Sequence, residues 1–380
     1  MSHIFLIAVE DSGDALGADV IDALRARDPN VRISGIGGAR MKARGAASEI
    51  DLSGLAVLGL IEGLKAFGRV KKAVEAAAEV VAKADPDAVV LIDSWGFMWR
   101  LAKALKQRGV KAKRIKLIGP QVWATRPGRA RVLAQWCDHL LCIHAFEEPF
   151  YTRWGLATTV IGNPALHRMK QGDGQAFRQR HGLGDRKRII GLLPGSRRAE
   201  MRRVAPTLVE ATEQICSGHP DRHVVVVAAG SAEATVRDMA KSWRFPYTLV
   251  TGEEEKANAF AAMEVAIACS GTVTTELGAQ GAAVVTGYKL GWITWALLRL
   301  FLLRSRYVTL MNVAANEEVA PEFVQTRFSA GHFAKVAERL LSEPGALATQ
   351  LRKQREALAV MAGSGRPAAE VAAETILKLA

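Results

Sequence analysis

The chain has little cysteine and no long uninterrupted apolar run. Its four cysteines are spread over 380 residues without the spacing of a disulfide framework, and a predicted strand begins at His3 with no signal peptide before it. The most apolar late segment, residues 290–303, contains Arg299 and is shorter than the roughly 20 residues that a spanning helix needs. We therefore expect a cytoplasmic protein without a membrane-spanning helix.

The common short motifs of nucleotide and metal enzymes are also missing. The chain has no Walker loop, no nucleophile elbow and no zinc-binding helix. Two cysteines and two histidines crowd into residues 137–144. However, Cys142 and His144 share one face of a predicted strand while His139 lies on the other, which disfavours a tetrahedral zinc site. We predict neither a metal ion nor a cofactor, and only His144, just after the strand, remains a histidine worth testing.

Composition and charge define the broad class. With 49% hydrophobic and 23% charged residues the chain is an ordinary globular protein, and 380 residues favour two domains over one. The net charge of +13, from 51 basic and 38 acidic residues, favours acidic partners such as nucleotides, phosphorylated substrates, nucleic acid or an anionic membrane surface. The sign of the charge narrows the function only slightly.

Apolar strands alternate with helices along most of the chain. We predict strands at 3–9, 31–35, 88–93, 115–118, 140–143 and 158–161, and again at 189–193, 223–229, 247–251, 265–268 and 283–286. Such a pattern predicts parallel sheets covered on both faces, and it occurs twice, with a break near Asn163-Pro164. The expected fold is α/β, with two doubly wound, Rossmann-like domains facing a cleft. The expected bounds are 1–164 and 165–355, with a helix in 356–380 that packs back on an N-terminal domain.

Two turns in the second half are suited to bind phosphate. The strand at 189–193 runs into Gly195-Ser196-Arg197 and then a helix, whose first amides lack partners and favour an anion, and Arg197 can add a charged contact. The strand at 265–268 runs into Ser270-Gly271-Thr272 in the same way. The two turns together suggest a diphosphate site. The alternative is that Ser270 and Thr272 only cap a helix.

The first turn of the chain, Glu10-Asp11-Ser12-Gly13-Asp14, has the opposite chemistry. Its three acidic residues would repel a pyrophosphate, so it is not a dinucleotide-binding turn. Carboxylates at this place can bind sugar hydroxyls or accept a proton. The alternative, compatible with the first, is that Ser12 and Asp14 cap the helix while Glu10 is solvated.

These motifs together resemble those of one family. The first turn and the segments 35–41, 120–126, 193–197, 270–272, 307–312 and 321–325 closely resemble the signatures of lipid-A-disaccharide synthase, in order and at compatible spacing. The resemblance covers essentially the whole chain. It implies an inverting, metal-independent glycosyltransferase of the two-domain B type. Such an enzyme transfers 2,3-diacylglucosamine from UDP to the 6-hydroxyl of 2,3-diacylglucosamine 1-phosphate (lipid X), forming the β-1,6 lipid A disaccharide and UDP.

The resemblance and the two kinds of turn together predict the site residues. For UDP-sugar binding they are Gly195, Ser196, Arg197, Ser270, Gly271, Thr272, Glu276 (suited to ribose hydroxyls), Asn312 and Gln325. For the acceptor they are Ser12, Gly13, Trp123 and Arg126.

The general base is predicted separately. Many family members carry a further aspartate three residues after the one at the end of the third strand, where this chain has Gly96. Asp93 is therefore the first candidate for the base, with Glu10 and Asp14 as alternates. The other interpretation of Asp93 is a buried carboxylate that holds its loop. Asp85-Pro86-Asp87 resembles a metal-binding Asp-x-Asp but more simply introduces this strand.

An acylated substrate implies contact with a membrane. Residues 290–306 combine two tryptophans with a basic end, and residues 52–70 precede Lys71-Lys72. We expect a peripheral association with the anionic inner membrane and no nucleic acid. A core helix or a dimer contact is the alternative for both segments. The resemblance also implies a homodimer that exchanges its C-terminal region. A UDP-sugar epimerase of the same fold and a non-catalytic nucleotide or lipid binding module are the competing functions.

Overall fold

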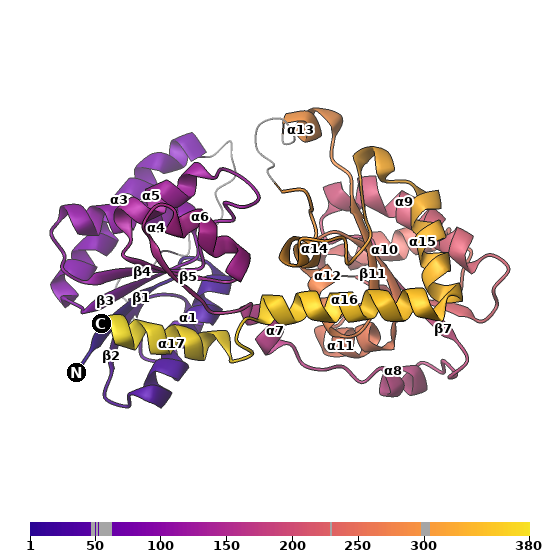
Figure 1. Cartoon of the computed structure of the whole chain (residues 1–380), viewed down its shortest axis with the longest axis horizontal. Helices are drawn as coiled ribbons and strands as arrows, with labels where there is room; N and C mark the ends of the chain where they lie inside the picture. The colour runs from indigo at the N-terminus through magenta and orange to yellow at the C-terminus, as the bar shows by residue number, and fades with distance from the viewer. Residues whose placement is uncertain (47–49, 51, 53–62, 229, 298–304) are drawn as a thin grey trace. The chain divides into compact units, whose positions relative to one another are not determined.

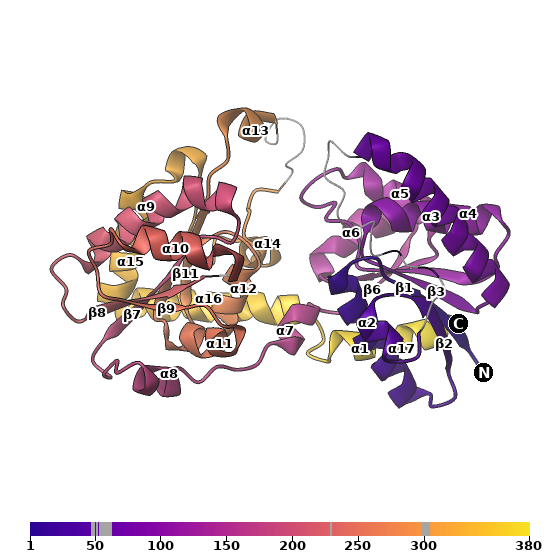
Figure 2. The same ribbon diagram turned by 180° about the vertical axis from the view of Figure 1, so that it is seen from behind.

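The computed structural model describes residues 1–380 except 47–49, 51, 53–62, 229 and 298–304. The described chain divides into two compact units (Figures 1 and 2). Unit 1 comprises residues 1–167 and 361–380, and unit 2 comprises residues 168–360. The predicted boundaries were 164/165 and 355/356.

Unit 1 is built on a six-stranded parallel sheet in the order β2-β1-β3-β4-β5-β6. Its strands are β1 (His3–Ile7), β2 (Arg32–Ile36), β3 (Ala88–Ile92), β4 (Lys113–Leu117), β5 (His139–Cys142) and β6 (Ala157–Val160). Its helices are α1 (Asp11–Arg27), α2 (Ala39–Lys42), α3 (Gly63–Ala84), α4 (Trp95–Gln107), α5 (Gly128–Trp136), η2 (Ala145–Glu147), α6 (Glu148–Thr152), α7 (Pro164–Arg168), which ends one residue into unit 2, and α17 (Ala368–Leu379).

Both faces of this sheet are covered, which is why its central strands β1 and β3 are almost continuously apolar. On one face α3, α4 and α5 bury residues such as Val81, Leu101 and Leu133. On the other, α1 lies beside α17, so that Val20 and Ile376 share one core although they are far apart in sequence (Figure 1). The last helix of the chain thus completes the core of unit 1.

Unit 2 repeats the architecture with the order β12-β11-β10-β7-β8-β9. Its strands are β7 (Arg188–Leu193), β8 (Arg222–Val227), β9 (Tyr247–Val250), β10 (Val265–Cys269), β11 (Ala283–Tyr288) and β12 (Glu322–Val324). Its helices are α8 (Gly174–Arg180), α9 (Arg198–Cys216), η3 (Gly230–Ala232), α10 (Glu233–Ala240), α11 (Glu253–Ala262), α12 (Val273–Ala279), α13 (Trp292–Leu297), α14 (Leu310–Ala315), η5 (Gln325–Arg327), α15 (Ala330–Ser342) and α16 (Pro344–Ala362), whose last two residues belong to unit 1.

The prediction of two doubly wound parallel sheets is confirmed. All eleven predicted strands are present, with ends within two residues of the predicted ones. Sequence analysis missed β12, because its three residues are too short to show a strand pattern. None of the described helices combines the length and the apolar character that a membrane span requires.

Candidate functional site

The strand orders show where each unit can bind a ligand. In a doubly wound sheet, ligands bind at the carboxyl ends of the two neighbouring strands whose connections leave in opposite directions. In unit 2 these strands are β7 and β10, and in unit 1 they are β1 and β3. The two turns predicted to bind phosphate follow β7 and β10, while the acidic turn and Asp93 follow β1 and β3. The topology therefore brings each predicted pair of segments together.

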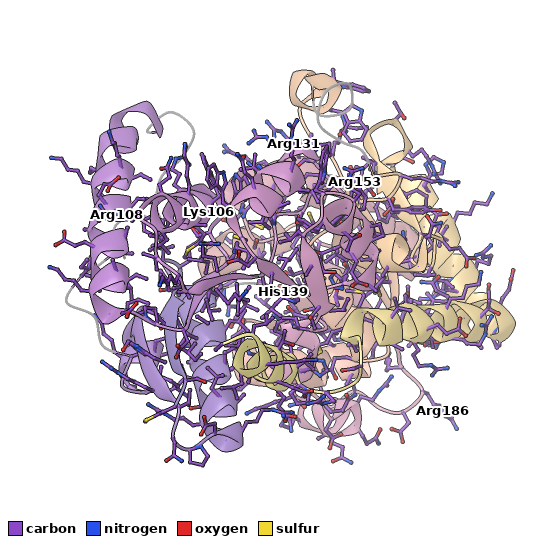
Figure 3. All side chains as sticks on the ribbon, turned by 60° about the vertical axis from the view of Figure 1, so that its left-hand side comes forward. Lys106, Arg108, Arg131, His139, Arg153 and Arg186 are labelled. Carbon is purple, nitrogen blue, oxygen red and sulfur yellow. The ribbon has the colours of Figure 1, made fainter. Side chains whose placement is uncertain are left out.

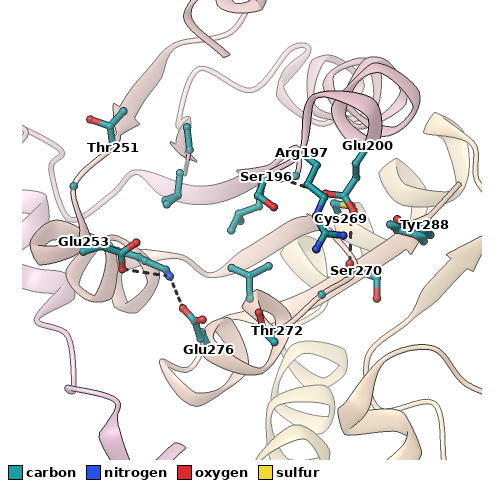
Figure 4. A pocket seen from close by; sticks show the side chains of 18 of the residues that line it. Ser196, Arg197, Glu200, Thr251, Glu253, Cys269, Ser270, Thr272, Glu276 and Tyr288 are labelled. Atoms are coloured by element: carbon teal, nitrogen blue, oxygen red, sulfur yellow. Dashed lines mark hydrogen bonds and ion pairs between the residues drawn. The ribbon is translucent and has the colours of Figure 1, made fainter. Parts of the chain in front are cut away.

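In unit 2 a pocket of about 520 Å³ lies at this point (Figure 4). Its lining includes every predicted phosphate-binding residue and the predicted ribose partner: Gly195, Ser196, Arg197, Ser270, Gly271, Thr272 and Glu276. The side chains of Arg197 and Thr272 are exposed, so both can reach a ligand.

The turn after β7 is shaped to present backbone amides. Gly195 has a φ of +112°, a region that only glycine adopts easily. Two residues later Arg197 is the N-cap residue of α9. In the part of the chain that the structure describes, the side chain of the N-cap residue makes no hydrogen bond to the first amides of this helix. With 19 residues, α9 directs a helix dipole of full strength at the pocket.

A carboxylate already lies beside these amides. Glu200, from the first turn of α9, accepts a hydrogen bond from the Ser196 amide at 3.3 Å. A Cβ atom added to Gly195 would lie only 2.9 Å from Glu200 Oε2, so the carboxylate covers the turn closely. Burial raises the pKa of Cys269 and of Tyr288, and Glu200 adds to both shifts. Sequence analysis did not single out Glu200, although its place three residues after a helix N-cap was a signal for it.

The other side of the pocket carries an ion pair. Lys256 of α11 lies 2.7 Å from Glu276 of α12 and 3.6 Å from Glu253 (Figure 4). Burial is the largest single influence on Lys256 and lowers its pKa, but the hydrogen bonds and charges of Glu276 and Glu253 together outweigh it, so the pKa is raised. Glu276, predicted to meet ribose hydroxyls, is therefore positioned by Lys256, a residue that sequence analysis did not identify.

Two predicted substrate residues have structural roles. Asn312 is fully buried, and its Oδ1 accepts from the amides of Val319 and Ala320 at 2.9 and 2.8 Å. Gln325 is buried and exchanges two hydrogen bonds with the backbone of Leu290. Neither is among the residues that line the pocket, and their contact with the substrate stays a prediction.

In unit 1 the acidic turn is divided between surface and core. Glu10 is half-buried and is the N-cap residue of α1, while Ser12 is exposed and Gly13 is buried against Ala8 and Ile92. Asp14 is 6% exposed, and its two oxygens accept from the amides of Arg40 and Met41 at 2.9 and 3.1 Å.

Asp14 thus caps a helix, though not its own as the sequence suggested. The amides of Arg40 and Met41 lie at the start of α2, the helix that follows β2. Each Asp14 oxygen therefore already accepts one backbone hydrogen bond, and its role as an alternate base stays a prediction that ranks behind Asp93 and Glu10.

Asp93 directly follows β3 and is half-buried. Asp93 and Ser94 have φ values of +48° and +36°, so two consecutive non-glycine residues are left-handed, at a cost of about 1–2 kcal/mol each. Gly96, which stands where many family members have aspartate, is exposed at the start of α4. Asp93 is therefore the carboxylate that the fold holds in an unusual conformation at the strand ends of unit 1.

The predicted acceptor residues Trp123 and Arg126 follow β4. Trp123 is 9% exposed, packs edge-on against Phe146 at 5.4 Å, and its Nε1 has no partner among the described residues. His144 stacks on the same phenyl ring at 5.0 Å, and burial lowers its pKa to about 4, which keeps the imidazole neutral. Arg126 is exposed and left-handed. Across the described ranges, no three His, Cys, Asp or Glu side chains are grouped to hold a metal ion.

Comparison with proteins of known sequence supplies the family. A family model described as Lipid-A-disaccharide synthetase matches residues 4–376. The lipid-A-disaccharide synthase of Rhodospirillum centenum is 36% identical over 378 residues, covering 99% of this chain and 94% of that protein. That of Paramagnetospirillum magneticum is 36% identical over 377 residues, covering 98% and 96%. That of Myxococcus xanthus is 34% identical over 383 residues, covering 99% and 97%.

Solved structures show a similar fold. MurG of Acinetobacter baumannii has a TM-score of 0.61 at 14% identity and covers 100% of both chains. MnaA of S. aureus, solved with UDP, has a TM-score of 0.61 at 12% identity and covers 93% of this chain and 91% of that one. A UDP-GlcNAc 2-epimerase of Neisseria meningitidis, bound to UDP-GlcNAc, has a TM-score of 0.59 at 11% identity, with 100% coverage of both.

The structural likeness alone does not distinguish a transferase from an epimerase, because both kinds of enzyme have this fold. The full-length sequence match makes that distinction. The chain belongs to the lipid-A-disaccharide synthase family and is a glycosyltransferase of the B-type fold.

Proposed function

We propose that the chain transfers 2,3-diacylglucosamine from UDP-2,3-diacylglucosamine to the 6-hydroxyl of lipid X, with inversion and without a metal ion. The observation that carries this proposal is the pocket of unit 2, in which two turns and Arg197 surround a space of about 520 Å³. Family membership and the solved relatives bound to UDP or UDP-GlcNAc support the choice of a UDP-sugar donor.

The donor's diphosphate would lie on the amides that begin α9, with Arg197 beside it. As the anomeric carbon loses its bond to the phosphate oxygen, negative charge grows on the departing UDP. The helix N-terminus and the Arg197 guanidinium stabilise that charge. In other transferases a metal ion stabilises the leaving group in this way. Glu276, held by Lys256 at 2.7 Å, accepts hydrogen bonds from the ribose hydroxyls.

The acceptor must lose a proton as its oxygen attacks. Asp93 is the proposed base, and Glu10, at the neighbouring strand end, is its alternate. The carboxylate takes the proton of the 6-hydroxyl, and the oxygen forms its bond to the anomeric carbon from the face opposite UDP. The carbon passes through an oxocarbenium-like state, and UDP leaves with the bonding electron pair. Ser12, Gly13, Trp123 and Arg126 supply the acceptor side of this site.

A basic surface of unit 1 supports the proposal that the substrates are lipids. Eleven of the chain's 51 basic residues, and none of its 38 acidic ones, lie in residues 95–137. Three exposed members of this region, Lys106, Arg108 and Arg131, are labelled in Figure 3, as is Arg153, which directly follows α6. This charge favours attraction to an anionic bilayer.

Within this region, side chains of α4 and α5 form a groove that we call the tryptophan–arginine groove. It is lined by Trp95, Trp99, Arg100, Lys103, Arg129, Val132, Gln135 and Trp136. Trp95 and Trp99 stack at 6.3 Å, with Arg100 4.6 Å from the Trp99 ring and Arg129 5.2 Å from the Trp95 ring. Burial, and then the charge of Arg126, lower the pKa of Arg129, which marks the region as electropositive. Indole rings beside cationic groups are typical of residues at the headgroup level.

The structure describes only part of the two segments that were predicted to dock on the membrane. In 290–306, Trp292 is 63% exposed, and residues 298–304 lie outside the described residues. In 52–70, residues 53–62 lie outside them as well. We propose that the tryptophan–arginine groove docks on the cytoplasmic face of the inner membrane, on the evidence of its stacked indole rings and neighbouring cations.

Vesicle co-sedimentation tests this assignment. Phosphatidylglycerol vesicles should pellet the wild type and its Lys241→Glu control in unit 2 equally, and should pellet Trp99→Ala with Lys103→Glu much less. Equal sedimentation of all three, or tighter binding to a DNA duplex than to vesicles, would overturn it.

We also propose a homodimer that exchanges the C-terminal region. In the chain itself, α17 buries Ala372, Ala373 and Ile376 against α1, and an identical surface on a second copy offers the same docking site. Light scattering measures the assembly, and a disulfide engineered between α1 and α17 shows whether the two helices belong to one chain or two. Crosslinks confined to single chains would contradict the exchange.

The product decides the reaction. Incubation with both lipid sugars should yield UDP and a β-1,6 disaccharide 1-phosphate, detected by mass spectrometry and by the anomeric NMR coupling, at a rate that EDTA leaves unchanged. A 2-epimer formed without acceptor would establish an epimerase instead. UDP-sugar binding without any turnover would leave a binding module.

A further inference from the structure

A lysine is buried beneath the strand ends of unit 1. Lys116, the fourth of the five residues of β4, is 1% exposed, and its neighbours across the sheet are Leu91 of β3 and Leu140 of β5. Both leucines belong to the apolar core that α3, α4 and α5 cover. A lysine at such a position is rare unless its ammonium is fully satisfied.

The ammonium is satisfied by backbone carbonyl groups alone. Lys116 Nζ donates to the carbonyl oxygens of Leu91 at 3.1 Å, Asp93 at 2.5 Å and Leu117 at 3.1 Å. These three acceptors match its three donor hydrogens.

Two of these three carbonyl groups lie next to residues with left-handed backbone conformations. The Asp93 carbonyl joins two left-handed residues, with φ of +48° at Asp93 and +36° at Ser94. The Leu117 carbonyl precedes Ile118, whose φ of +63° is an outlier for a β-branched residue. Such conformations persist only when their surroundings fix them, and one ammonium bonds the peptide groups of both turns.

We propose that Lys116 is the positioning residue for Asp93: its buried ammonium fixes the left-handed Asp93–Ser94 turn and supplies a positive charge that attracts the Asp93 carboxylate. This inference rests on the proposed role of Asp93 as the base. Lys116 itself contacts no substrate.

The charges around Lys116 agree with this role. Burial lowers the pKa of Lys116 to about 8, and the opposing influences come from Asp93, Cys137 and Glu10. Cys137 is a neutral thiol at this pH, since burial raises its pKa to about 12. The charged groups that face the ammonium are therefore the two carboxylates proposed for catalysis, Asp93 after β3 and Glu10 after β1.

The sign of the expected pH dependence follows. Below about pH 8 the ammonium is charged, the turn is held and the carboxylate has its counter-charge. As the pH rises through this value, Lys116 loses its proton and with it one donor and the positive charge. Turnover should therefore fall on the alkaline side near pH 8.

The test compares Lys116→Met with Lys113→Met, an exposed lysine on the same strand. Lys116→Met should lower kcat about 100-fold, the cost of a misplaced catalytic group, and should remove the alkaline decline. The KM for the donor and the UDP affinity of unit 2 should not change, and Lys113→Met should behave as wild type. A Lys116→Met enzyme with wild-type kcat, or with its alkaline decline intact, would overturn the inference.

Two further measurements do not depend on that variant's activity. Hydrogen exchange in a peptide spanning 89–98 should be faster in Lys116→Met than in wild type, while a peptide of unit 2 serves as the reference. Unchanged exchange there would contradict the positioning role even if no disaccharide forms at all. Should Lys116→Met fail to fold, the wild-type profile decides, since a kcat that stays level from pH 7 to beyond 9 rules the role out.

Discussion

The two units have the same kind of sheet but opposite chemistry at the ends of their strands. At the β7–β10 end of unit 2 the first turn offers the Arg197 side chain and the backbone amides that begin α9, and the second offers hydroxyl groups. At the β1–β3 end of unit 1 the corresponding turns offer the carboxylates of Glu10 and Asp93. One architecture thus presents the proposed anion site in one unit and the proposed base in the other. The fold provides the place, and a few turn residues decide what binds there.

The comparison extends to how each turn is held. In unit 2 a glycine with φ of +112° makes the turn, and the Glu200 carboxylate lies over it. In unit 1 two non-glycine residues are left-handed, and the Lys116 ammonium lies beneath them. The accompanying charges differ in effect. In unit 1 the Lys116 ammonium is opposite in sign to the Asp93 carboxylate, whereas in unit 2 the Glu200 carboxylate has the same sign as the diphosphate proposed to bind. Variants in the two units should separate turnover from donor binding.

Asp93→Asn should produce the largest effect. Removal of the base should lower kcat by about 10²–10⁴-fold, the usual contribution of a general base, and leave UDP affinity unchanged. Steady-state kinetics and calorimetry measure the two quantities. Asp11→Asn, an exposed residue of the acidic turn, is the matched control. Wild-type turnover in Asp93→Asn would shift the role to Glu10.

Arg197→Ala should act in the opposite way, on the donor. Loss of a charged hydrogen bond costs about 1.5–3 kcal/mol, so UDP affinity should fall about 10–100-fold. Calorimetry at two salt concentrations measures it, with Arg202→Ala on the same helix as control. Equal affinities for the two variants would remove Arg197 from the site.

Gly195→Ala tests whether the backbone of the turn matters. A side chain there would force a φ of +112° on alanine and bring its Cβ to 2.9 Å from Glu200, which should cost about 1–3 kcal/mol in stability or UDP affinity. Gly184→Ala, outside the pocket, is the control, because a Cβ there meets nothing within 4 Å and its φ is not positive. Thermal unfolding measures the stability of the two variants, and calorimetry measures their UDP affinity. Equal values for both variants would mean that the turn tolerates a side chain at position 195.

Glu200→Gln should give the smallest effect. It removes a negative charge from the turn proposed to receive the diphosphate but keeps an acceptor for the Ser196 amide. UDP should then bind about 2–5-fold more tightly at low salt, since partly exposed charge pairs contribute less than about 1 kcal/mol. Weaker binding would mean that the charge of Glu200 is needed to shape the turn.

Much of this arrangement was predictable from sequence, and the parts that were not have a common cause. The strands, the pocket-lining turn residues and Asp93 at a strand end follow from local patterns of apolar, glycine and hydroxyl residues. Asn312 and Gln325 were predicted at the substrate because they stand in matching motifs, but their hydrogen bonds run to loops at Val319 and Leu290. Asp14 caps α2, which begins 25 residues later in the chain. No local pattern reveals such long-range partners.

The sequence by itself determined the two parallel sheets, the turns at their ends and the family, because apolar periodicity and turn chemistry act over a few neighbouring residues. Only the tertiary structure decided which polar groups are used internally and which remain for a ligand. Lys116 shows the reason: in sequence it is one basic residue among many, and its role depends on burial beneath three carbonyl groups contributed by two different strand ends. Burial and long-range hydrogen bonds exist only once the strands are assembled.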